Sequence, residues 1–139
     1  EVQRLDLGSR LAFAGFRDDM PDVFAGLDLL VLSSVSGEGS PAVVKEAMAA
    51  GTPLVATALD GLEEIVQDAR HGLLVPPGNA PALGRAIVIL ARDAPLRARY
   101  SAAALQRVME FTSDAMVEKT ERVYQSIERP PIEGGAARA

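Results

Sequence analysis

The sequence of 139 residues contains no cysteine and a single histidine, His71. Without cysteine the chain can form neither a disulfide framework nor a thiolate metal site. With one histidine, zinc catalysis is not expected either. We therefore predict no bound metal and no cofactor, and the lack of cysteine is compatible with a reducing compartment.

Positive charge and long apolar runs are also scarce. The 14 Lys and Arg residues are outnumbered by 19 Asp and Glu residues, so the formal net charge of -5 gives no basis for binding nucleic acid. No apolar run approaches the roughly 20 residues of a membrane span, and residues 1–6 lack the pattern of a signal peptide. We expect a cytoplasmic chain with no membrane span and no nucleic-acid partner.

Short apolar runs alternate with segments that favour helices. This alternation predicts an α/β fold, with a Rossmann-like parallel sheet, flanking helices and right-handed crossovers. We expect one domain over residues 1–128 and a disordered tail at residues 129–139, where prolines, glycines and small residues show no periodicity. The predicted strands are residues 11–16, 27–32, 54–57 and 73–75.

Helices are predicted around these strands. Residues 1–10 have the pattern of a helix end, and Pro21 opens a short helix. Asn79 caps a helix over residues 80–92, Pro95 opens another to about residue 108, and Ser113 caps the last helix. The last helix carries an apolar stripe that we expect to be core. It consists of Met116, Val117, Thr120, Val123, Tyr124 and Ile127.

Residues 33–53 form the stretch around which the domain is organised. Gly37 and Gly39 let the backbone of a loop approach a ligand closely. Ser40 is predicted as the N-cap of a helix that begins at Pro41 and ends at Gly51.

The start of this helix is a predicted anion site. Its first amides, on Ala42 and Val43, have no partner within the helix and would face the crevice above the sheet. Such an arrangement suits a phosphate or the diphosphate of a nucleotide.

Two glutamates flank the anion site, Glu38 in the loop and Glu46 in the helix. One interpretation is that both are solvated, with Glu46 exposed beside Lys45. The other is that both lie at the rim of the crevice, because Val44 and its neighbours bury the opposite side of the helix. A carboxylate there could accept paired hydrogen bonds from the vicinal hydroxyls of a ribose or a hexose.

The block of sequence from Glu38 onward resembles a family signature. Glu38-x7-Glu46 continues as Glu-Ala-Met-Ala-Ala-Gly-Thr-Pro-Leu-Val-Ala-Thr, which resembles the signature of retaining GT-B glycosyltransferases of the group 1 type. The resemblance implies that Glu38 contacts the donor sugar at the catalytic centre and that Glu46 holds the ribose hydroxyls. It also places the sugar and diphosphate on the loop and helix start, at Gly39, Ser40, Ala42 and Val43.

Further roles are implied elsewhere in the chain. The end of the strand at residues 11–16 lies near the nucleotide base in this family, so Phe16 and Arg17 are candidates for base contacts; the alternative is an ordinary turn with a solvated arginine. Asp60 stands where the family most often has the first glycine of a pair, which weakens the expectation of a donor contact from this loop. His71 could be a general base, but a turn residue before Gly72 is the preferred interpretation.

The resemblance covers residues 1 to about 127, the later part of the family's carboxyl-terminal domain. It implies transfer of a sugar from a nucleotide diphosphate donor in carbohydrate biosynthesis, and an amino-terminal acceptor domain, or another chain, as partner. Unpaired sheet edges would also permit a homo-oligomer. Two alternatives remain: a non-catalytic interaction or regulatory domain derived from this fold, and a GT-B nucleotide-sugar epimerase.

Overall fold

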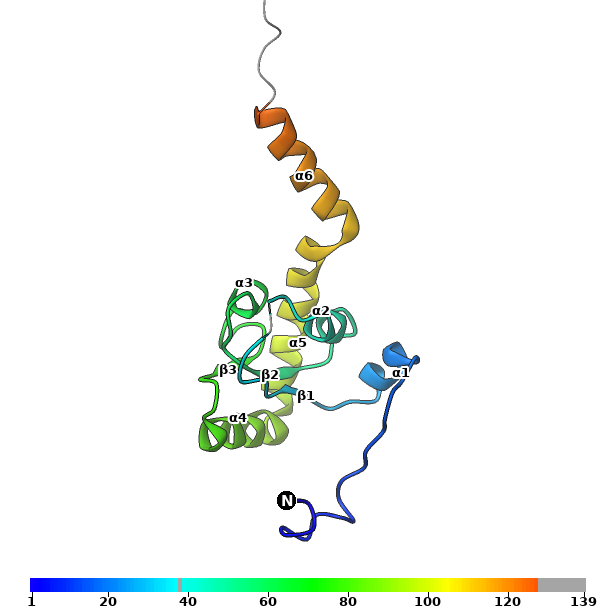
Figure 1. Ribbon diagram of the computed structural model, residues 1–139, viewed down its shortest axis with the longest axis vertical. Coiled ribbons are helices and arrows are strands. Elements are labelled where there is room, and N and C mark those ends of the chain that lie inside the picture. Colours follow the sequence, from blue (N-terminus) through cyan, green and yellow to red (C-terminus); the bar gives the residue numbers. More distant parts are fainter. Residues whose placement is uncertain (38, 128–139) are drawn as a thin grey trace, which may run out of the picture.

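The computed structural model describes residues 1–37 and 39–127. The predicted tail at residues 129–139 therefore lies outside the described residues. The helices and strands follow the predicted α/β order (Figure 1). They are α1 (Met20–Ala25), β1 (Leu30–Leu32), α2 (Ala42–Ala49), β2 (Leu54–Thr57), α3 (Leu62–Ile65), β3 (Leu73–Val75), α4 (Ala80–Arg92), α5 (Ala94–Val108), a 3-10 turn (Met109–Phe111) and α6 (Ser113–Ile127).

The three described strands form one parallel sheet in the order β1-β2-β3. The central strand β2 is buried along its whole length, as is usual for a strand covered on both faces. The strand predicted over residues 27–32 is shorter than expected, Leu30–Leu32, and is not fully buried, since Val31 is 38% exposed. Leu54 pairs with Leu30 of β1, and Val55 pairs with Leu73 of β3. The predicted parallel sheet with flanking helices is confirmed.

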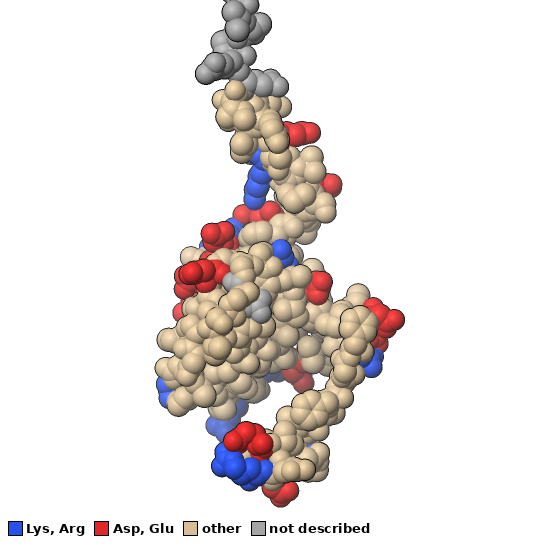
Figure 2. Space-filling model, in the orientation of Figure 1, with Lys and Arg blue, Asp and Glu red and all other residues tan. Residues whose placement is uncertain are grey.

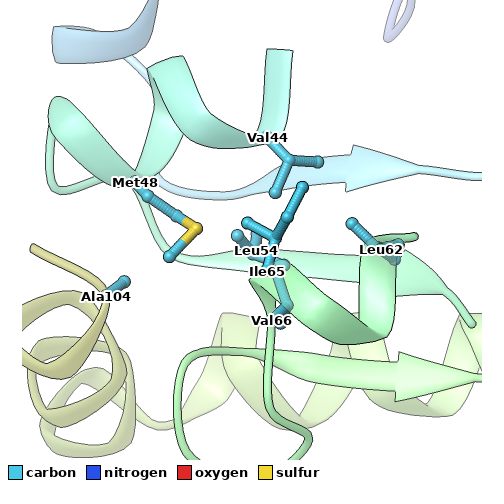
Figure 3. Close-up of a cluster of buried hydrophobic side chains, with 8 residues drawn as sticks. Val44, Met48, Leu54, Leu62, Ile65, Val66 and Ala104 are labelled. Atoms are coloured by element: carbon cyan, nitrogen blue, oxygen red, sulfur yellow. The ribbon is translucent and has the colours of Figure 1, made fainter. Parts of the chain in front are cut away.

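Helices cover both faces of the sheet, because successive side chains of β2 point to opposite sides. Leu54 and Ala56 belong to one apolar cluster, which contains side chains of α2, α3 and α5, including Met48 and Ile65 (Figure 3). Val55 belongs to the other cluster, made mainly with α4 and α5. That second cluster includes Val75, Ala86, Leu90 and Tyr100.

The observed helix cap agrees with the predicted one at α4 and differs from the prediction at α5 and α6. The side chain of Asn79 accepts a hydrogen bond from the amide of Ala82, which confirms the predicted cap. Asp93 caps α5, which begins at Ala94, one residue before Pro95. Ser113 was wrongly predicted as a cap: it is the first residue of α6, and the hydroxyl of Thr112 accepts from the amide of Ala115.

The first nineteen residues contain neither the predicted helix end at residues 1–10 nor the predicted strand at residues 11–16. The first ten form turns, and residues 11–16 are an exposed irregular segment in which Phe13 is 87% exposed. The strand prediction is wrong because a strand needs a neighbour to complete its hydrogen bonds. Among the described strands, β1 pairs with β2 alone, and none lies beside this segment.

The apolar stripe of α6 is not part of the core of the described structure. None of the residues of α6 is buried, and Val123 and Tyr124 are 60% and 64% exposed. Figure 1 shows α6 extending away from the sheet and its covering helices. The periodicity predicted an apolar face correctly, but a periodicity does not specify what that face contacts.

Acidic and basic side chains are interspersed over the described part of the face drawn in Figure 2, without a continuous basic surface. This distribution fits the formal net charge of -5. Of the helices that the structure describes, none combines the length and apolar character needed to cross a membrane.

Candidate functional site

Two loops meet at the carboxyl edge of the sheet, one after β1 and one after β2. They touch at Gly61 and Gly39. Gly61 has a φ of +83°, and a Cβ added there would lie 1.6 Å from the carbonyl oxygen of Gly39. Only glycine permits both this backbone conformation and this approach. The β2–α3 loop is thus held directly against the loop that precedes α2.

A pocket of about 580 Å³ lies between the two loops. This volume is within the range of about 300–1,000 Å³ that is usual for small-molecule sites. Among the described lining residues, Asp60 alone carries an ionisable side chain, and its carboxylate makes no hydrogen bond or ion pair with any described residue. The pocket is lined by Val35, Ser36, Gly37, Gly39, Leu59, Asp60 and Gly61.

Beside this loop, α2 begins at Ala42, one residue later than predicted. Pro41 occupies the N-cap position, so the prediction of Ser40 as the cap is wrong. The hydroxyl of Ser40 instead accepts a hydrogen bond of 3.1 Å from Nζ of Lys45. Proline has no side-chain acceptor to offer, so the first turn of α2 carries no side-chain cap.

The uncapped first turn leaves backbone donors available. No hydrogen bond from the amides of Ala42 and Val43 to a described residue is present. Ala42 is exposed and Val43 is half-buried, so these donors start a helix at the molecular surface. Unpaired amides and the positive end of the helix dipole together attract an anion, and the Lys45 ammonium lies at the same end of α2.

Glu46 is exposed and lines a different pocket, between α1 and α2. This pocket has a volume of about 510 Å³ and is otherwise apolar, with Phe24 of α1 among its walls. Glu46 does not line the pocket between the loops. The other lining residues are Met20, Pro21, Ala25, Ala49 and Ala50.

Phe16 and Arg17 lie on the segment just before α1. Phe16 is 96% exposed and is free to contact a ligand. Nε of Arg17 donates to a carboxylate oxygen of Asp19 at 2.6 Å, and the second carboxylate oxygen accepts from the same guanidinium. This hydrogen-bonded arginine is the main reason that the pKa of Asp19 lies below its usual value. The arginine is thus paired and not simply solvated.

The structure brings only some of the predicted site residues together. Gly39 is part of the loop pocket, whereas Ser40, Ala42 and Val43 form the adjoining start of α2. Glu46 is one turn further along α2, on the side that faces α1. Glu38 lies outside the described residues.

The side chain of His71 is buried, and its Nδ1 accepts a hydrogen bond of 3.1 Å from the amide of Gln67. This bond closes the turn that leads through Gly72 into β3, at the edge of the sheet opposite to the two loops. The preferred interpretation of His71 as a turn residue fits this position. Burial is the main cause that lowers the pKa of His71, and the positive charges of Arg70 and Arg107 add to it.

We expect the chain to lose stability as the pH falls through the range below the ordinary histidine value of 6.5. The folded state favours neutral His71, so the unfolded chain binds more protons in this range and the free energy of unfolding falls. A protonated Nδ1 would also lose its hydrogen bond from Gln67. The loss should level off once the pH is below the lowered folded pKa.

Thermal unfolding between about pH 7.5 and about pH 5 measures this effect. The control is His71→Asn, whose side-chain oxygen can accept from the same amide but does not titrate. The expected result is a flatter pH dependence in the variant. Identical slopes for the two proteins would show that other groups cause the change.

Sequence reasoning did not identify three features of this site. The contact between Gly39 and Gly61 joins residues far apart in the chain, and the glycines signalled only two separate turns. The bond from Lys45 to Ser40 spans five residues, which is not a regular helical spacing, and it forms because Ser40 lies outside the helix. The apolar wall that α1 presents to Glu46 had no sequence signal.

Comparisons with known proteins place the chain in a family. The model of the family described as glycosyl transferases group 1 matches residues 1–93. Phosphatidyl-myo-inositol mannosyltransferase of Mycobacterium leprae (strain TN) is 36% identical over 123 residues, which make up 87% of this chain and 33% of that protein.

Solved structures show the same fold. Anabaena Alr3699/HepE in complex with UDP-glucose superposes with a TM-score of 0.82 at 29% identity, over 91% of this chain and 35% of that chain. Sucrose-phosphate synthase from Thermosynechococcus elongatus gives a TM-score of 0.80 at 32% identity, over 91% of this chain and 32% of that chain.

The chain thus spans about a third of the length of the relatives it matches. Its parallel sheet with flanking helices corresponds to a carboxyl-terminal-like portion of GT-B glycosyltransferases. By the match of the family model and by its identity to these relatives, the chain belongs to the group 1 glycosyltransferases.

Proposed function

We propose that this chain is the donor-binding part of a retaining glycosyltransferase of the Glu-x7-Glu type. The reaction would transfer a sugar from a nucleotide diphosphate donor to an acceptor hydroxyl with retention at the anomeric carbon. The observation that carries the proposal is the uncapped start of α2 beside a pocket of ligand size. The UDP-glucose bound to Anabaena Alr3699/HepE supports a nucleotide sugar as the ligand.

In this proposal the diphosphate lies at the start of α2. The amides of Ala42 and Val43 donate to its oxygens, and Lys45 adds a positive charge at the same end of the helix. Charge develops on the leaving diphosphate as the glycosidic bond breaks, so donors already fixed in place stabilise the transition state. The proposal includes no metal and no cofactor.

The nucleoside would extend from the diphosphate along α2 toward α1. Glu46 would accept hydrogen bonds from the vicinal ribose hydroxyls, and the apolar side chains of its pocket would pack against the ring. The base would then point to the segment just before α1, where Phe16 and Arg17 lie. Glu38 is proposed to contact the donor sugar on the basis of the sequence signature alone.

Catalysis needs more than these groups supply. A helix start contributes about 0.3–1 kcal/mol, and about 2 kcal/mol in a partly buried site, whereas enzymes lower barriers by about 8–23 kcal/mol. We therefore propose that an amino-terminal acceptor domain, or another chain, completes the active site. The exposed apolar stripe of α6 and the outer edges of β1 and β3, which pair with no other described strand, are surfaces for such an association or for a homo-oligomer.

The donor site is tested by calorimetric titration of the 139-residue chain with uridine, guanosine, adenosine and thymidine diphosphates. We expect one of them to bind, and Glu46→Ala to raise its dissociation constant about tenfold or more, because hydrogen bonds to a charged group contribute about 1.5–3 kcal/mol. The matched control is Glu121→Ala, which removes an exposed glutamate from α6. It should leave the affinity unchanged.

Absence of binding by all four nucleotides would contradict the donor site and favour a non-catalytic interaction domain. Equal affinities of one nucleotide for the wild type and Glu46→Ala would show that Glu46 does not hold the ribose. Product analysis with the two-domain protein separates the remaining functions. A glycoside with the donor's anomeric configuration supports retention, whereas an altered nucleotide sugar without an acceptor would identify an epimerase.

A further inference from the structure

We propose that Asp60 selects the donor sugar, an inference that rests on the proposed nucleotide-sugar site and extends it to the β2–α3 loop. The family most often has a glycine at this position. A glycine has no side chain, so the resemblance implies no side-chain contact to the sugar here. The structure places Asp60 in the pocket that the loop after β1 and the loop after β2 enclose.

The position of Asp60 is set by its neighbour in the chain. Gly61 lies so close to the Gly39 carbonyl oxygen that a Cβ would overlap it at 1.6 Å. This contact holds the segment that carries Asp60 against the loop that leads into α2. The diphosphate is proposed to bind at the start of α2. A sugar attached to that diphosphate therefore has the pocket within reach.

Charge determines which part of the ligand would occupy the pocket. A carboxylate repels a diphosphate but accepts hydrogen bonds from sugar hydroxyls, which are neutral donors. Asp60 is exposed, lines the pocket and forms no hydrogen bond or ion pair with a described residue, so its oxygens can accept hydrogen bonds from a ligand. The anionic part of the donor would lie at the start of α2 and the neutral sugar beside Asp60.

The remaining walls suit a sugar ring. Val35 and Leu59 offer apolar surface to the C–H groups of a pyranose, and Ser36 adds a hydroxyl. The volume of about 580 Å³ accommodates a hexose together with water. Of the described lining residues, Asp60 alone brings a carboxylate, and it would distinguish sugars by the position and orientation of the hydroxyls that can reach it.

The experiment compares two ligands on the same chain: the nucleoside diphosphate that binds wild type and its glucose conjugate. Asp60→Asn keeps the size of the side chain and removes its charge. It should raise the dissociation constant of the sugar conjugate about tenfold, because hydrogen bonds to a charged group are stronger than neutral ones. The constant for the diphosphate should change less than about twofold. Asp114→Asn, at an exposed position in α6, is the matched control.

The outcomes separate this inference from the proposed function. If wild type binds the diphosphate and Asp60→Asn changes both constants equally, or neither, Asp60 does not select the sugar while the donor site stands. If wild type binds neither ligand, the donor site itself is contradicted, and this inference with it. A selective loss for the conjugate, absent in Asp114→Asn, supports it.

Discussion

Replacing Leu54 with alanine is expected to lower the free energy of unfolding by about 2–5 kcal/mol. Leu54 opens the central strand β2 and is fully buried, within a cluster that contains Met48 of α2 and Ile65 of α3. Alanine would leave a cavity between the sheet and both helices, and the loss of buried apolar contacts would add to its cost. A domain of this size has a total stability of only about 5–15 kcal/mol.

Urea unfolding followed by circular dichroism measures this change, provided that the slope of the transition is unchanged. The control is Leu5→Ala, because Leu5 is 52% exposed and its truncation removes little buried surface. A loss of less than about 1 kcal/mol in Leu54→Ala would contradict the packing described for β2.

Gly72→Ala is expected to lower the free energy of unfolding by about 1–3 kcal/mol, because the added methyl group overpacks the start of β3. A Cβ at this position would lie 2.7 Å from the carbonyl oxygen of Leu54 and 2.7 Å from its Cδ1. The side chain could move, but the carbonyl oxygen belongs to the central strand. The strands β2 and β3 would therefore separate locally, next to the turn that His71 closes.

The matched control for this substitution is Gly84→Ala in α4. A Cβ there meets nothing within 4 Å, and alanine in place of a helical glycine stabilises by about 0.5–1 kcal/mol. The midpoint temperature of thermal unfolding should thus fall for Gly72→Ala and rise for Gly84→Ala. A stabilising effect of Gly72→Ala would show that the two strands are further apart than described.

The double variant Leu54→Ala, Gly72→Ala tests which atoms cause the clash. Residues in contact do not give additive effects. Leu54→Ala removes Cδ1, so the new Cβ at position 72 would clash only with the carbonyl oxygen of residue 54. The double variant should therefore lose less stability than the sum of the losses in the two single variants. A strictly additive result would assign the whole clash to the backbone.

Part of the candidate site could be predicted from the sequence. The presence of a helix after the loop, the glycine stop at Gly51 and the loop glycines follow from local backbone preferences, which act within a few residues. The prediction of Ser40 as the cap failed because Pro41, placed next to it, occupies the cap position itself. The separation of Glu46 from the loop pocket depends on α1, whose position the local sequence does not specify.

The segments that were predicted wrongly share a physical cause. Residues 11–16 have the composition of a strand but no neighbouring strand among the described ones. Helix α6 has an apolar stripe, but no element in the described part of the chain buries it. Strand formation and burial both require a partner surface. A pattern along the chain specifies what a segment could bury and not whether that surface is present.

By itself the sequence determined the α/β class, the strand over residues 54–57, the helix over residues 80–92 with its Asn79 cap, and a block that points to the group 1 family. Each depends on periodicity, caps or motifs that act over short distances. Only the tertiary structure decided that Gly61 contacts Gly39 and that Asp60 faces a pocket. The reason is that β2 and its parallel neighbour β1 bring their carboxyl ends to the same edge, which joins loops that are distant along the chain.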